Sequence, residues 1–451
     1  MGSPALWNGS AATPVADSSR SRRNMHVAYI HQHFSTTRGA TGTRSYEMSQ
    51  RLLRAGHRVT MICGAYEAGD QRVVSNRRVV ECEVDGIRVL RIAELYANRM
   101  GFARRVLAFG RFARTATGVV SKLDADLVFA TSTPLTVGIP GMKGARRLGV
   151  PFVFEVRDLW PELAIALGVI KHPLLTWYTR RLERNIYHAA HRIIALAPGI
   201  KEGICRTGYP PDRVTMIPNS CDLDLFRPSD DILVDKRFGS PDEFRLVFTG
   251  AHGLANGLHA VLDAAAELKR RNVVGIRFVF IGKGGQRDAL IRRSHAEGLH
   301  SVVTWAPPIP KTELARILPG MDVGMMILKN VPAFYYGTSP NKFFDYIASG
   351  LPVLNNYPGW IAELVERNHC GVVVPPDDAP SFADAVIRLR EGRESLPEMG
   401  RRARQLAEAQ FSRDTLGDQL VAVLESTHQE FTHRRRTTQP VRVAGGRGTG
   451  L

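Results

Sequence analysis

The chain has 451 residues, of which 44% are hydrophobic and 23% are charged, and these ordinary globular values exclude a disordered, collagen-like or coiled-coil protein. At about 100–200 residues per domain, the length predicts two to four domains. No apolar stretch approaches the roughly 18 residues that a membrane-spanning helix needs. The five cysteines never occur in C-x-x-C spacing, and residues 1–24 lack the apolar core of a signal peptide. We therefore expect a reducing, cytoplasmic setting.

The net charge is +17, and part of it lies at the two ends of the chain. Residues 1–24 hold three arginines and one aspartate, and residues 431–451 hold five arginines and no acid. A basic excess of this size favours acidic partners, such as nucleotide phosphates, nucleic acid or an anionic membrane face. We expect no nucleic-acid partner, because the sequence contains no helix-turn-helix, zinc-finger or RNP motif.

In the first half of the chain, short apolar runs alternate with segments of helical period. An Asp85–Gly86 turn signal between two β-rich arms predicts a hairpin. Strands that alternate with helices predict a largely parallel sheet. We expect strands at 26–30, 58–63, 126–131, 151–156, 191–197 and 214–218, a hairpin over 79–92, and helices at 42–56, 99–122 and 174–190.

The same pattern restarts in the second half. We expect strands at 245–250, 277–282, 302–305, 323–328, 352–354 and 371–374, helices at 257–271 and 287–298, and a long helical tail from 381 to about 430. The fold predicted is α/β, with two doubly wound Rossmann-like domains that face each other across a cleft. Ligands of such sheets bind beyond the carboxyl ends of the strands, so the site is expected in that cleft.

These patterns divide the chain into five parts. We predict domains at 25–225 and 226–405, a C-terminal helix at 406–430 that packs back towards the first domain, and disordered tails at 1–24 and 431–451.

Glycine-bearing loops that follow a strand and open a helix are the first candidates for ligand binding. Their backbone N–H groups and the helix N-terminus suit a phosphate, and Lys283 adds a cation. The candidates are Gly39, Gly42 and Arg44 in the first loop, Gly250, Gly253 and Asn256 in the second, and Lys283 in the third.

The segment from Ser339 to Pro352 is the strongest candidate. Ser339 is expected to cap a helix, and the free N–H groups near Asn341 and Lys342 would meet a diphosphate. Asp345, one turn deeper, would accept hydrogen bonds from ribose hydroxyls. A purely structural helix explains the apolar residues here but not Lys342 or Asp345.

Four ionisable residues cluster at the expected end of the strand at 151–156, in the segment Glu155-Val-Arg-Asp-Leu-Trp-Pro-Glu162. We interpret it as a substrate-facing loop in which Arg157, Asp158 and Glu162 are the catalytic candidates. The alternative is a structural ion pair between Arg157 and Asp158. His31 and His33, at the end of the first strand, either face the cleft or are ordinary buried histidines.

Together these segments resemble the retaining GT-B glycosyltransferases of family 4, and most closely the branch that assembles bacterial O-antigen, colanic acid and related surface polysaccharides. The similarity covers residues 25 to about 430. It is carried by the ordered set GTRSYEMSQRLLRAGHRVTMI, EVRDLWPE, IPNSCDLDLF, TGAHGLANGL, SPNKFFDYIASGLPVL and GVVVPPDDAPSFADAVIRL.

The resemblance implies a first domain on the acceptor side and a second domain that binds a nucleotide-sugar, usually UDP-linked. It implies transfer with retention of the anomeric configuration, no metal and no cofactor. Gly39 and Gly42 match the donor-phosphate loop, and Asp345 matches the second Glu of the family's Glu-seven residues-Glu motif, which binds the ribose. The stretch from Trp305 to Lys311 matches the segment that lines the nucleobase with backbone.

The sequence departs from the family pattern in two places. Gly337 stands where the first Glu of the motif is expected. The Arg and Lys that hold the diphosphate are replaced by other residues of the second glycine loop, Ala251, His252 and Asn256. We expect Lys342, Lys283 and the region of Arg157 to supply the cations instead.

The mechanism implied is front-face displacement, in which cations and helix N-termini stabilise the leaving diphosphate while an acceptor hydroxyl attacks from the same face. The acceptor is expected to be a glycan or a lipid-linked glycan. The basic, aromatic-bearing segment Arg99–Lys122 suits an anionic bilayer, which would place the protein peripherally on the inner face of the plasma membrane; a packed helix with a solvated basic face is the alternative.

Two rival functions share this fold. A nucleotide-sugar epimerase would need paired acids in the cleft, for which Asp158 and Glu162 are the candidates. A non-catalytic nucleotide-sugar-binding partner is the other rival, because Gly337 departs from the motif.

Overall fold

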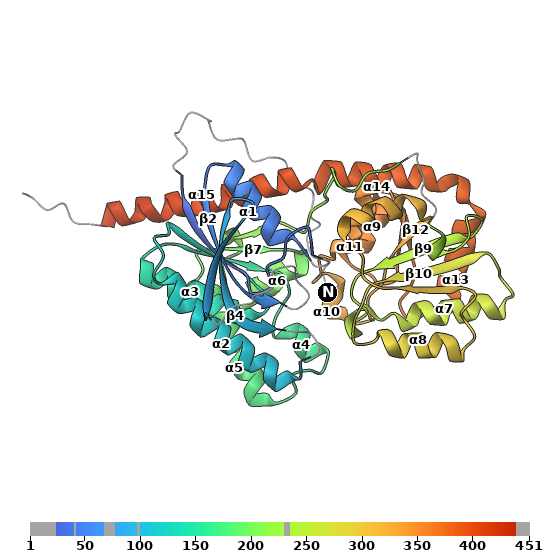
Figure 1. The fold of residues 1–451 in the computed structure, drawn as a ribbon, viewed down its shortest axis with the longest axis horizontal. Helices are drawn as coiled ribbons and strands as arrows, with labels where there is room; N and C mark the ends of the chain where they lie inside the picture. Colours follow the sequence, from blue (N-terminus) through green and yellow to red (C-terminus); the bar gives the residue numbers. More distant parts are fainter. Residues whose placement is uncertain (1–23, 40–41, 67–76, 97–99, 230–234, 439–451) are drawn as a thin grey trace, which may run out of the picture.

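The computed structural model describes residues 24–39, 42–66, 77–96, 100–229 and 235–438. They form two α/β domains side by side, each built around one sheet, with the C-terminal helices of the chain running along one edge of both (Figure 1). The predicted fold class is confirmed.

The first sheet has eight strands in the order β3-β4-β2-β1-β5-β6-β7-β8. Only the hairpin β3–β4 is antiparallel, and its turn at Asp85 and Gly86 has positive φ at both residues, as predicted. The strands are β1 (His26–Ile30), β2 (Arg58–Tyr66), β3 (Val79–Val84), β4 (Ile87–Tyr96), β5 (Leu127–Thr131), β6 (Phe152–Val156), β7 (Arg192–Ala195) and β8 (Val214–Met216).

The helices of this domain cover the sheet on both faces. Helices α2 and α5 both pack against α3, while α1 packs against the C-terminal helix. Every residue of β1, β5 and β6 is buried, which is expected of strands in the middle of a parallel sheet. The helices are α1 (Arg44–Arg54), α2 (Phe102–Val120), α3 (Gly138–Leu148), α4 (Glu162–Ala166), α5 (Pro173–Ala189) and α6 (Pro198–Arg206).

The second sheet has six parallel strands in the order β11-β10-β9-β12-β13-β14. They are β9 (Phe244–Thr249), β10 (Ile276–Ile281), β11 (Val303–Ala306), β12 (Val323–Met326), β13 (Val353–Asn355) and β14 (Gly371–Val373). Its helices are α7 (His259–Arg270), α8 (Arg287–Ala296), α9 (Lys311–Ile317), α10 (Pro332–Tyr335), α11 (Asn341–Ala348), α12 (Trp360–Arg367), α13 (Ala379–Glu391) and α14 (Leu396–Gln410).

The chain crosses between the domains twice, and the two crossings are hydrogen-bonded to each other. The N–H of Cys221 donates to the carbonyl of Phe411 (2.7 Å), and the N–H of Arg413 donates back to the carbonyl of Cys221 (3.1 Å). The linker after β8 and the break between α14 and the last helix therefore form one double-stranded hinge.

The expected helical tail is not continuous. It is divided into α13, α14 and α15 (Arg413–Thr438), with breaks at 392–395 and 411–412. Helix α14 packs on α11 of the second domain, whereas α15 packs on α1 of the first. The predicted boundary at 405 is thus wrong by about one helical turn, because α14 stays with the second domain to its end.

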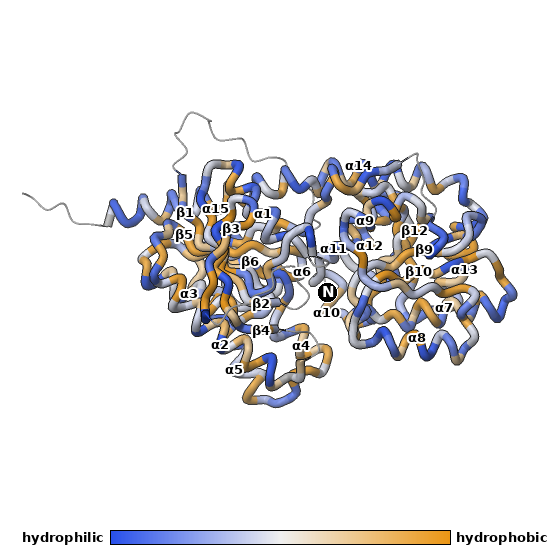
Figure 2. The backbone as a smooth tube through the Cα atoms, in the orientation of Figure 1, coloured by the Kyte–Doolittle hydropathy of each residue, from blue (hydrophilic) through white to orange (hydrophobic). Residues whose placement is uncertain are grey.

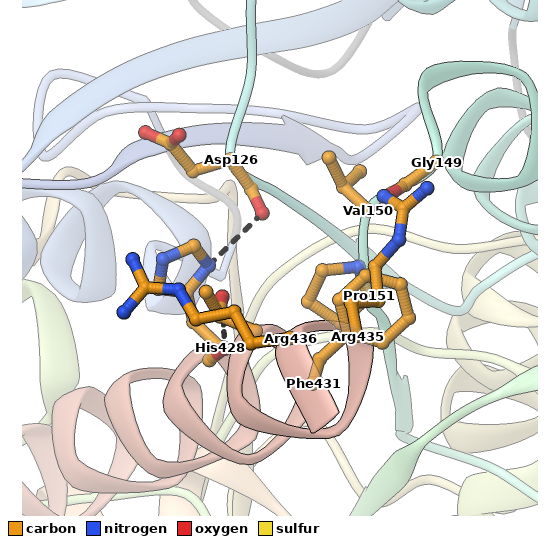
Figure 3. Close-up of a pocket in the computed structure, with 9 residues that line it drawn as sticks. Asp126, Gly149, Val150, Pro151, His428, Phe431, Arg435 and Arg436 are labelled. Atoms are coloured by element: carbon orange, nitrogen blue, oxygen red, sulfur yellow. Dashed lines mark hydrogen bonds between the residues drawn. The ribbon is translucent and has the colours of Figure 1, made fainter. Parts of the chain in front are cut away.

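Helix α15 also extends eight residues into the segment 431–451 that we expected to be disordered. Its last turns pack against the first sheet where β5 and β6 begin (Figure 3). The Nδ1 of His428 donates to the carbonyl of Asp126 (3.2 Å), and Arg435 donates to the carbonyl of Gly149. These contacts supply packing that the basic sequence alone does not reveal.

Candidate functional site

A cavity of about 360 Å³ lies between the two domains. Both domains line it, and most of the lining comes from loops after the carboxyl ends of strands in the second sheet. Six of the sequence candidates line it, namely Gly42, Gly250, Lys283, Asn341, Lys342 and Asp345.

Helix α11 points its N-terminus at this cavity, with Asn341 and Lys342 in its first turn. The prediction that Ser339 caps this helix is wrong, because the N-cap is Pro340. The hydroxyl of Ser339 instead accepts a hydrogen bond from the backbone N–H of Asn219 in the linker (2.9 Å). The first N–H groups of α11 therefore have no side-chain cap and remain available to an anion.

The ammonium group of Lys342 is held inside the second domain's part of the cavity. Its Nζ lies 3.4 Å from Oδ1 of Asn256 and 4.6 Å from the ring centroid of Phe248. Burial lowers the pKa of Lys342 to about 8, although the nearby carboxylate of Asp345 acts in the opposite direction. A desolvated cation with one amide partner is suited to receive an anionic ligand.

Asp345 is buried one turn deeper in α11, where its Oδ1 accepts a hydrogen bond from Lys311 (3.2 Å). In the part of the chain that the structure describes, Oδ2 has no hydrogen-bond partner. Lys311, at the start of α9, was missed as a side-chain candidate. Only its position in the segment predicted to line the nucleobase marked it in advance.

The two glycine loops of the second domain lock together through their backbones. The N–H of Gly250 donates to the carbonyl of Ile281 (2.9 Å), and the N–H of His252 donates to the carbonyl of Lys283 (2.9 Å). A Cβ at Gly282 would lie 1.9 Å from the carbonyl oxygen of Gly250, so no larger residue fits there. This close approach fixes the edge of the cavity that carries Lys283.

His252 is fully buried beneath these loops, against the rings of Phe280 and Trp305. Burial, together with the nearby cations Arg287 and Lys342, lowers its pKa to about 4, so the ring is neutral at neutral pH. His252 therefore does not replace the cation that the family pattern places in this loop.

Three other candidates, Gly39, Gly253 and Asn256, are not among the residues that line the cavity. Gly253 begins a short 3₁₀ turn, and Asn256 uses its amide both to bond the carbonyl of Ala251 (2.7 Å) and to contact Lys342. Gly39 closes a turn with Thr36 before the helix begins.

Arg44, predicted to bind the nucleotide-sugar donor, is instead engaged within the first domain and the linker. Its side chain is 3% exposed and forms a buried ion pair with Glu155 (2.8 Å), while its remaining N–H groups donate to the carbonyls of Ile217 and Pro218. Thr131 donates to the other oxygen of Glu155 (2.6 Å). This network ties the start of α1 to the sheet and to the linker. The guanidinium of Arg44 is therefore already paired and is not available to a phosphate, contrary to what the motif had suggested.

The catalytic candidates after β6 are separated. Arg157 lies next to the cavity, with Nη2 3.7 Å from the position of a Cβ on Gly42. Asp158 accepts a hydrogen bond from Thr133 (3.1 Å), and burial raises its pKa. Glu162 begins α4 at the surface and pairs with Arg206 (3.3 Å), so it is not part of a catalytic group with Asp158.

The two histidines after β1 differ in their contacts. His31 is buried and its Nδ1 is hydrogen-bonded to Ser45 (2.7 Å); burial holds its pKa well below the usual range. The ring of His33 packs against those of Tyr66 and Tyr96, with 4.9 and 4.5 Å between ring centroids. Burial lowers the pKa of His33 to about 3. Tyr66, which sequence reasoning missed, lines the cavity, whereas His33 is not one of its lining residues.

Among the residues that the structure describes, no group of three His, Cys, Asp or Glu side chains is placed to hold a metal ion. The described helices include none that is long and apolar enough to cross a membrane.

Comparison with known proteins supplies the family. Residues 39–220 match the model described as a glycosyl transferase 4-like domain, and residues 243–391 match the model described as glycosyl transferases group 1. The two matches divide the chain as the two sheets do and together cover most of it. The chain belongs to the GT-B glycosyltransferases.

Three curated relatives illustrate how far the sequence of this glycosyltransferase has diverged. It is 26% identical to the alpha-D-kanosaminyltransferase of Streptomyces kanamyceticus over 62% of this chain and 71% of that protein. It is 25% identical to the GDP-mannose-dependent alpha-mannosyltransferase of Mycobacterium tuberculosis over 92% and 99%. It is 30% identical to the D-inositol 3-phosphate glycosyltransferase of Nocardia farcinica over 49% of each.

Solved structures agree on the fold of the glycosyltransferase. Sucrose-phosphate synthase from Thermosynechococcus elongatus superposes with a TM-score of 0.70 at 17% identity, covering 91% of this chain and 100% of that one. Anabaena HepE in complex with UDP-glucose superposes with a TM-score of 0.64 at 17% identity, covering 89% and 100%.

Proposed function

We propose that this glycosyltransferase transfers a sugar from a UDP-linked donor to an acceptor hydroxyl with retention of configuration, in the assembly of a surface polysaccharide or a lipid-linked glycan. The observation that carries the proposal is the position of Lys342. Its desolvated ammonium lies beside the uncapped N-terminus of α11, in a cavity between the two domains.

In this account the donor diphosphate occupies the space between α11 and the two locked glycine loops. Lys342 and Lys283 supply cations, and Asn341 brings the first N–H groups of α11. A charged hydrogen bond of this kind contributes about 1.5–3 kcal/mol. Because the leaving group gains negative charge during transfer, these contacts strengthen in the transition state and accelerate the reaction.

Asp345 and Lys311 then hold the nucleoside. The free Oδ2 of Asp345 accepts from a ribose hydroxyl, while Lys311 fixes the carboxylate through Oδ1. The first acid of the family motif has no counterpart here. A Cβ on Gly337 would lie 2.4 Å from the carbonyl oxygen of Ala333, so the backbone at this position accepts only glycine and the donor sugar is held by other groups.

The first domain supplies the acceptor side. Arg157 is the group next to the cavity that we assign to the reacting centre, where it stabilises the diphosphate from the side opposite Lys342. Asp158, with a raised pKa, is the nearest acid to it in sequence, and we assign it to the positioning of the acceptor. Glu162 has no role in this account because it is paired at the surface.

Two relatives carry the word alpha in their names, which is consistent with retention if their donors are alpha-linked. The HepE structure contains UDP-glucose, whereas the mycobacterial relative is named for GDP-mannose. A donor panel must therefore include both nucleotides.

A surface on the first domain supports a membrane-bound acceptor. Helix α2 exposes Val106 (51%) and Leu107 (59%) next to arginines, and α5 exposes Trp177 (62%) and Tyr178. Both helices pack on α3 and lie along the lower edge of the domain in Figure 2. Exposed aromatic and aliphatic side chains among cations suit the headgroup region of an anionic bilayer.

The deciding experiment incubates the enzyme with UDP- and GDP-sugars, with and without glycan acceptors, and analyses the products by mass spectrometry and by the anomeric coupling in NMR spectra. Transfer with retention from a UDP-sugar supports the proposal. Conversion of the donor in the absence of acceptor would indicate an epimerase, and donor binding without any product would indicate a non-catalytic partner.

A further inference from the structure

A second cavity, of about 750 Å³, lies on the opposite side of the second domain from the cleft, where the strands of the sheet begin. It is formed by the interdomain linker at Pro228 and Ser229, the start of β9, the turn between α11 and β13, and helix α14. Its volume is in the range of small-molecule sites. It shares no lining residue with the cavity between the domains.

Four arginines line this second cavity, against one acid. The arginines are Arg245, Arg393, Arg401 and Arg404, and the acid is Asp322. Both oxygens of Asp322 are already engaged: Oδ1 pairs with Arg393 (2.8 Å), and Oδ2 accepts from the backbone N–H of Arg245 (2.7 Å). Arg401 and Arg404 pair with acids of α14 that do not line the cavity, Glu398 and Glu408. Of the four lining arginines, Arg245 is thus the one whose side chain forms no ion pair with the residues that the structure describes.

Arg245 lines the cavity, yet it is almost entirely buried. It is 4% exposed, and its guanidinium has no hydrogen bond or ion pair with any of the residues that the structure describes. Burial lowers the pKa of Arg245 and the neighbouring Arg393 acts in the same direction, while the carboxylates of Asp322 and Glu243 act against them without restoring the usual value. Asp322 lies near this guanidinium but forms no hydrogen bond with it, and a buried guanidinium without hydrogen-bond partners is costly; a bound anion would offset that cost.

The remaining arginines are placed to complete such a site. Arg401 and Arg393 reach the cavity from α14 and from the turn before it, with side chains that are 68% and 46% exposed. Guanidinium groups from several directions favour an oxyanion with several acceptors, above all a phosphate. Apolar walls at Met321, Leu351 and Pro397 leave room for an organic group attached to it.

We propose that this cavity binds a phosphate-bearing small molecule, whose phosphate pairs with Arg245 and is closed over by Arg393 and Arg401. The site is separate from the donor site proposed above and does not depend on it.

The ligand would also connect three elements of the second half of the chain. Arg404, in the wall of the cavity, donates to the carbonyls of Phe226 in the linker (2.8 Å) and of Ala348 at the end of α11 (2.7 Å). An anion bound here would hold the linker, α14 and the donor-binding helix α11 in one arrangement.

The test measures the binding of pyrophosphate and of a phosphate monoester to the protein by calorimetry, and the melting temperature of the protein with and without each of them. It uses the full chain carrying Lys342→Met, so that the donor site contributes little. The variants are Arg245→Met and Arg401→Gln, with Arg292→Gln on the exposed face of α8 as the matched loss of one positive charge.

We expect the phosphates to bind and to raise the melting temperature of the parent and of Arg292→Gln. Arg245→Met should weaken this binding at least tenfold, and Arg401→Gln several-fold. Without ligand, Arg245→Met should be as stable as the parent or more stable, because it removes a buried cation whose side chain has no hydrogen-bond partner.

Two results would overturn the proposal. One is phosphate binding that is equal in the parent and in Arg245→Met, or absent from both at millimolar concentration. The other is a large loss of stability in ligand-free Arg245→Met, which would mean that the guanidinium has an internal partner. Stronger binding of the monoester than of pyrophosphate would identify an organic phosphate, and the reverse would identify an inorganic one.

Discussion

The ammonium of Lys342 lies 3.4 Å from the side-chain oxygen of Asn256, so a cation from α11 reaches the glycine loop that itself has no cation. The resemblance to the family leads us to expect basic residues in this loop, where Ala251, His252 and Asn256 stand instead. In this chain the amide of Asn256 holds the lysine that comes from the opposite wall of the cavity. We therefore expect Lys342 to supply the positive charge that this loop lacks.

The pH dependence of donor affinity should reflect this lysine. Because burial lowers the pKa of Lys342 to about 8 in the free protein, the lysine is charged below pH 8 and affinity is flat there. A bound diphosphate favours the charged form and raises the pKa, so binding takes up a proton above pH 8 and weakens by up to about tenfold per pH unit. Calorimetry across pH 6–10 should show this break in the wild type and not in Lys342→Arg. A break that persists in the arginine variant would assign it to another group.

Asp345→Ala should weaken donor binding by about 1–3 kcal/mol, because it removes a charged acceptor for the ribose. The fold should survive, since the apolar face of α11 is unchanged. Calorimetric titration with Asp288→Ala as the control on the exposed α8 measures this. Equal affinities of the two variants for the donor would place Asp345 outside the site.

The fold could be predicted almost completely from the sequence, because the apolar runs and turn signals are local. The site could not, because its pairings are not local. Arg44 follows a glycine turn that suggests a phosphate, yet it pairs with Glu155, which is 111 residues away and whose position beside it depends on the strand order. Lys311 meets Asp345 for the same reason, because the fold brings the start of α9 next to α11, and no spacing in the sequence indicates that pair.

Transfer should proceed equally in EDTA and with added magnesium or manganese. In the proposed function, ammonium groups and helix N–H groups hold the leaving diphosphate, and the described residues include no carboxylate cluster suited to a metal ion. Initial rates after exhaustive chelation test this directly. A strict requirement for a divalent cation would contradict the assignment of Lys342 and Lys283 as the groups that stabilise the leaving diphosphate.

Replacing Arg104, Arg105 and Arg114 by Gln should reduce binding to anionic vesicles. Arg111 is left in place because it is paired with Glu94 (2.7 Å). Each cation near such a surface contributes about 1 kcal/mol, and salt screens the interaction, so the loss should be up to about 3 kcal/mol and should shrink at high ionic strength. Activity on a soluble acceptor should be retained.

The matched control for this surface replaces Arg292, Arg316 and Arg367, three exposed arginines of the second domain, by Gln. Vesicle binding that falls equally in both triple variants would show an effect of net charge alone. A wild type that does not bind anionic vesicles would mean that α2 only has a solvated basic face.

The most direct test of the account compares donor binding by the wild type, Lys342→Arg and Lys342→Met in calorimetry at pH 7. We expect Lys342→Met to lose about 1.5–3 kcal/mol of donor affinity, with its melting temperature unchanged or raised, because it removes a desolvated cation from the cavity. Lys342→Arg should retain most of the affinity. Donor affinity that is unchanged in Lys342→Met would contradict the claim that Lys342 holds the diphosphate.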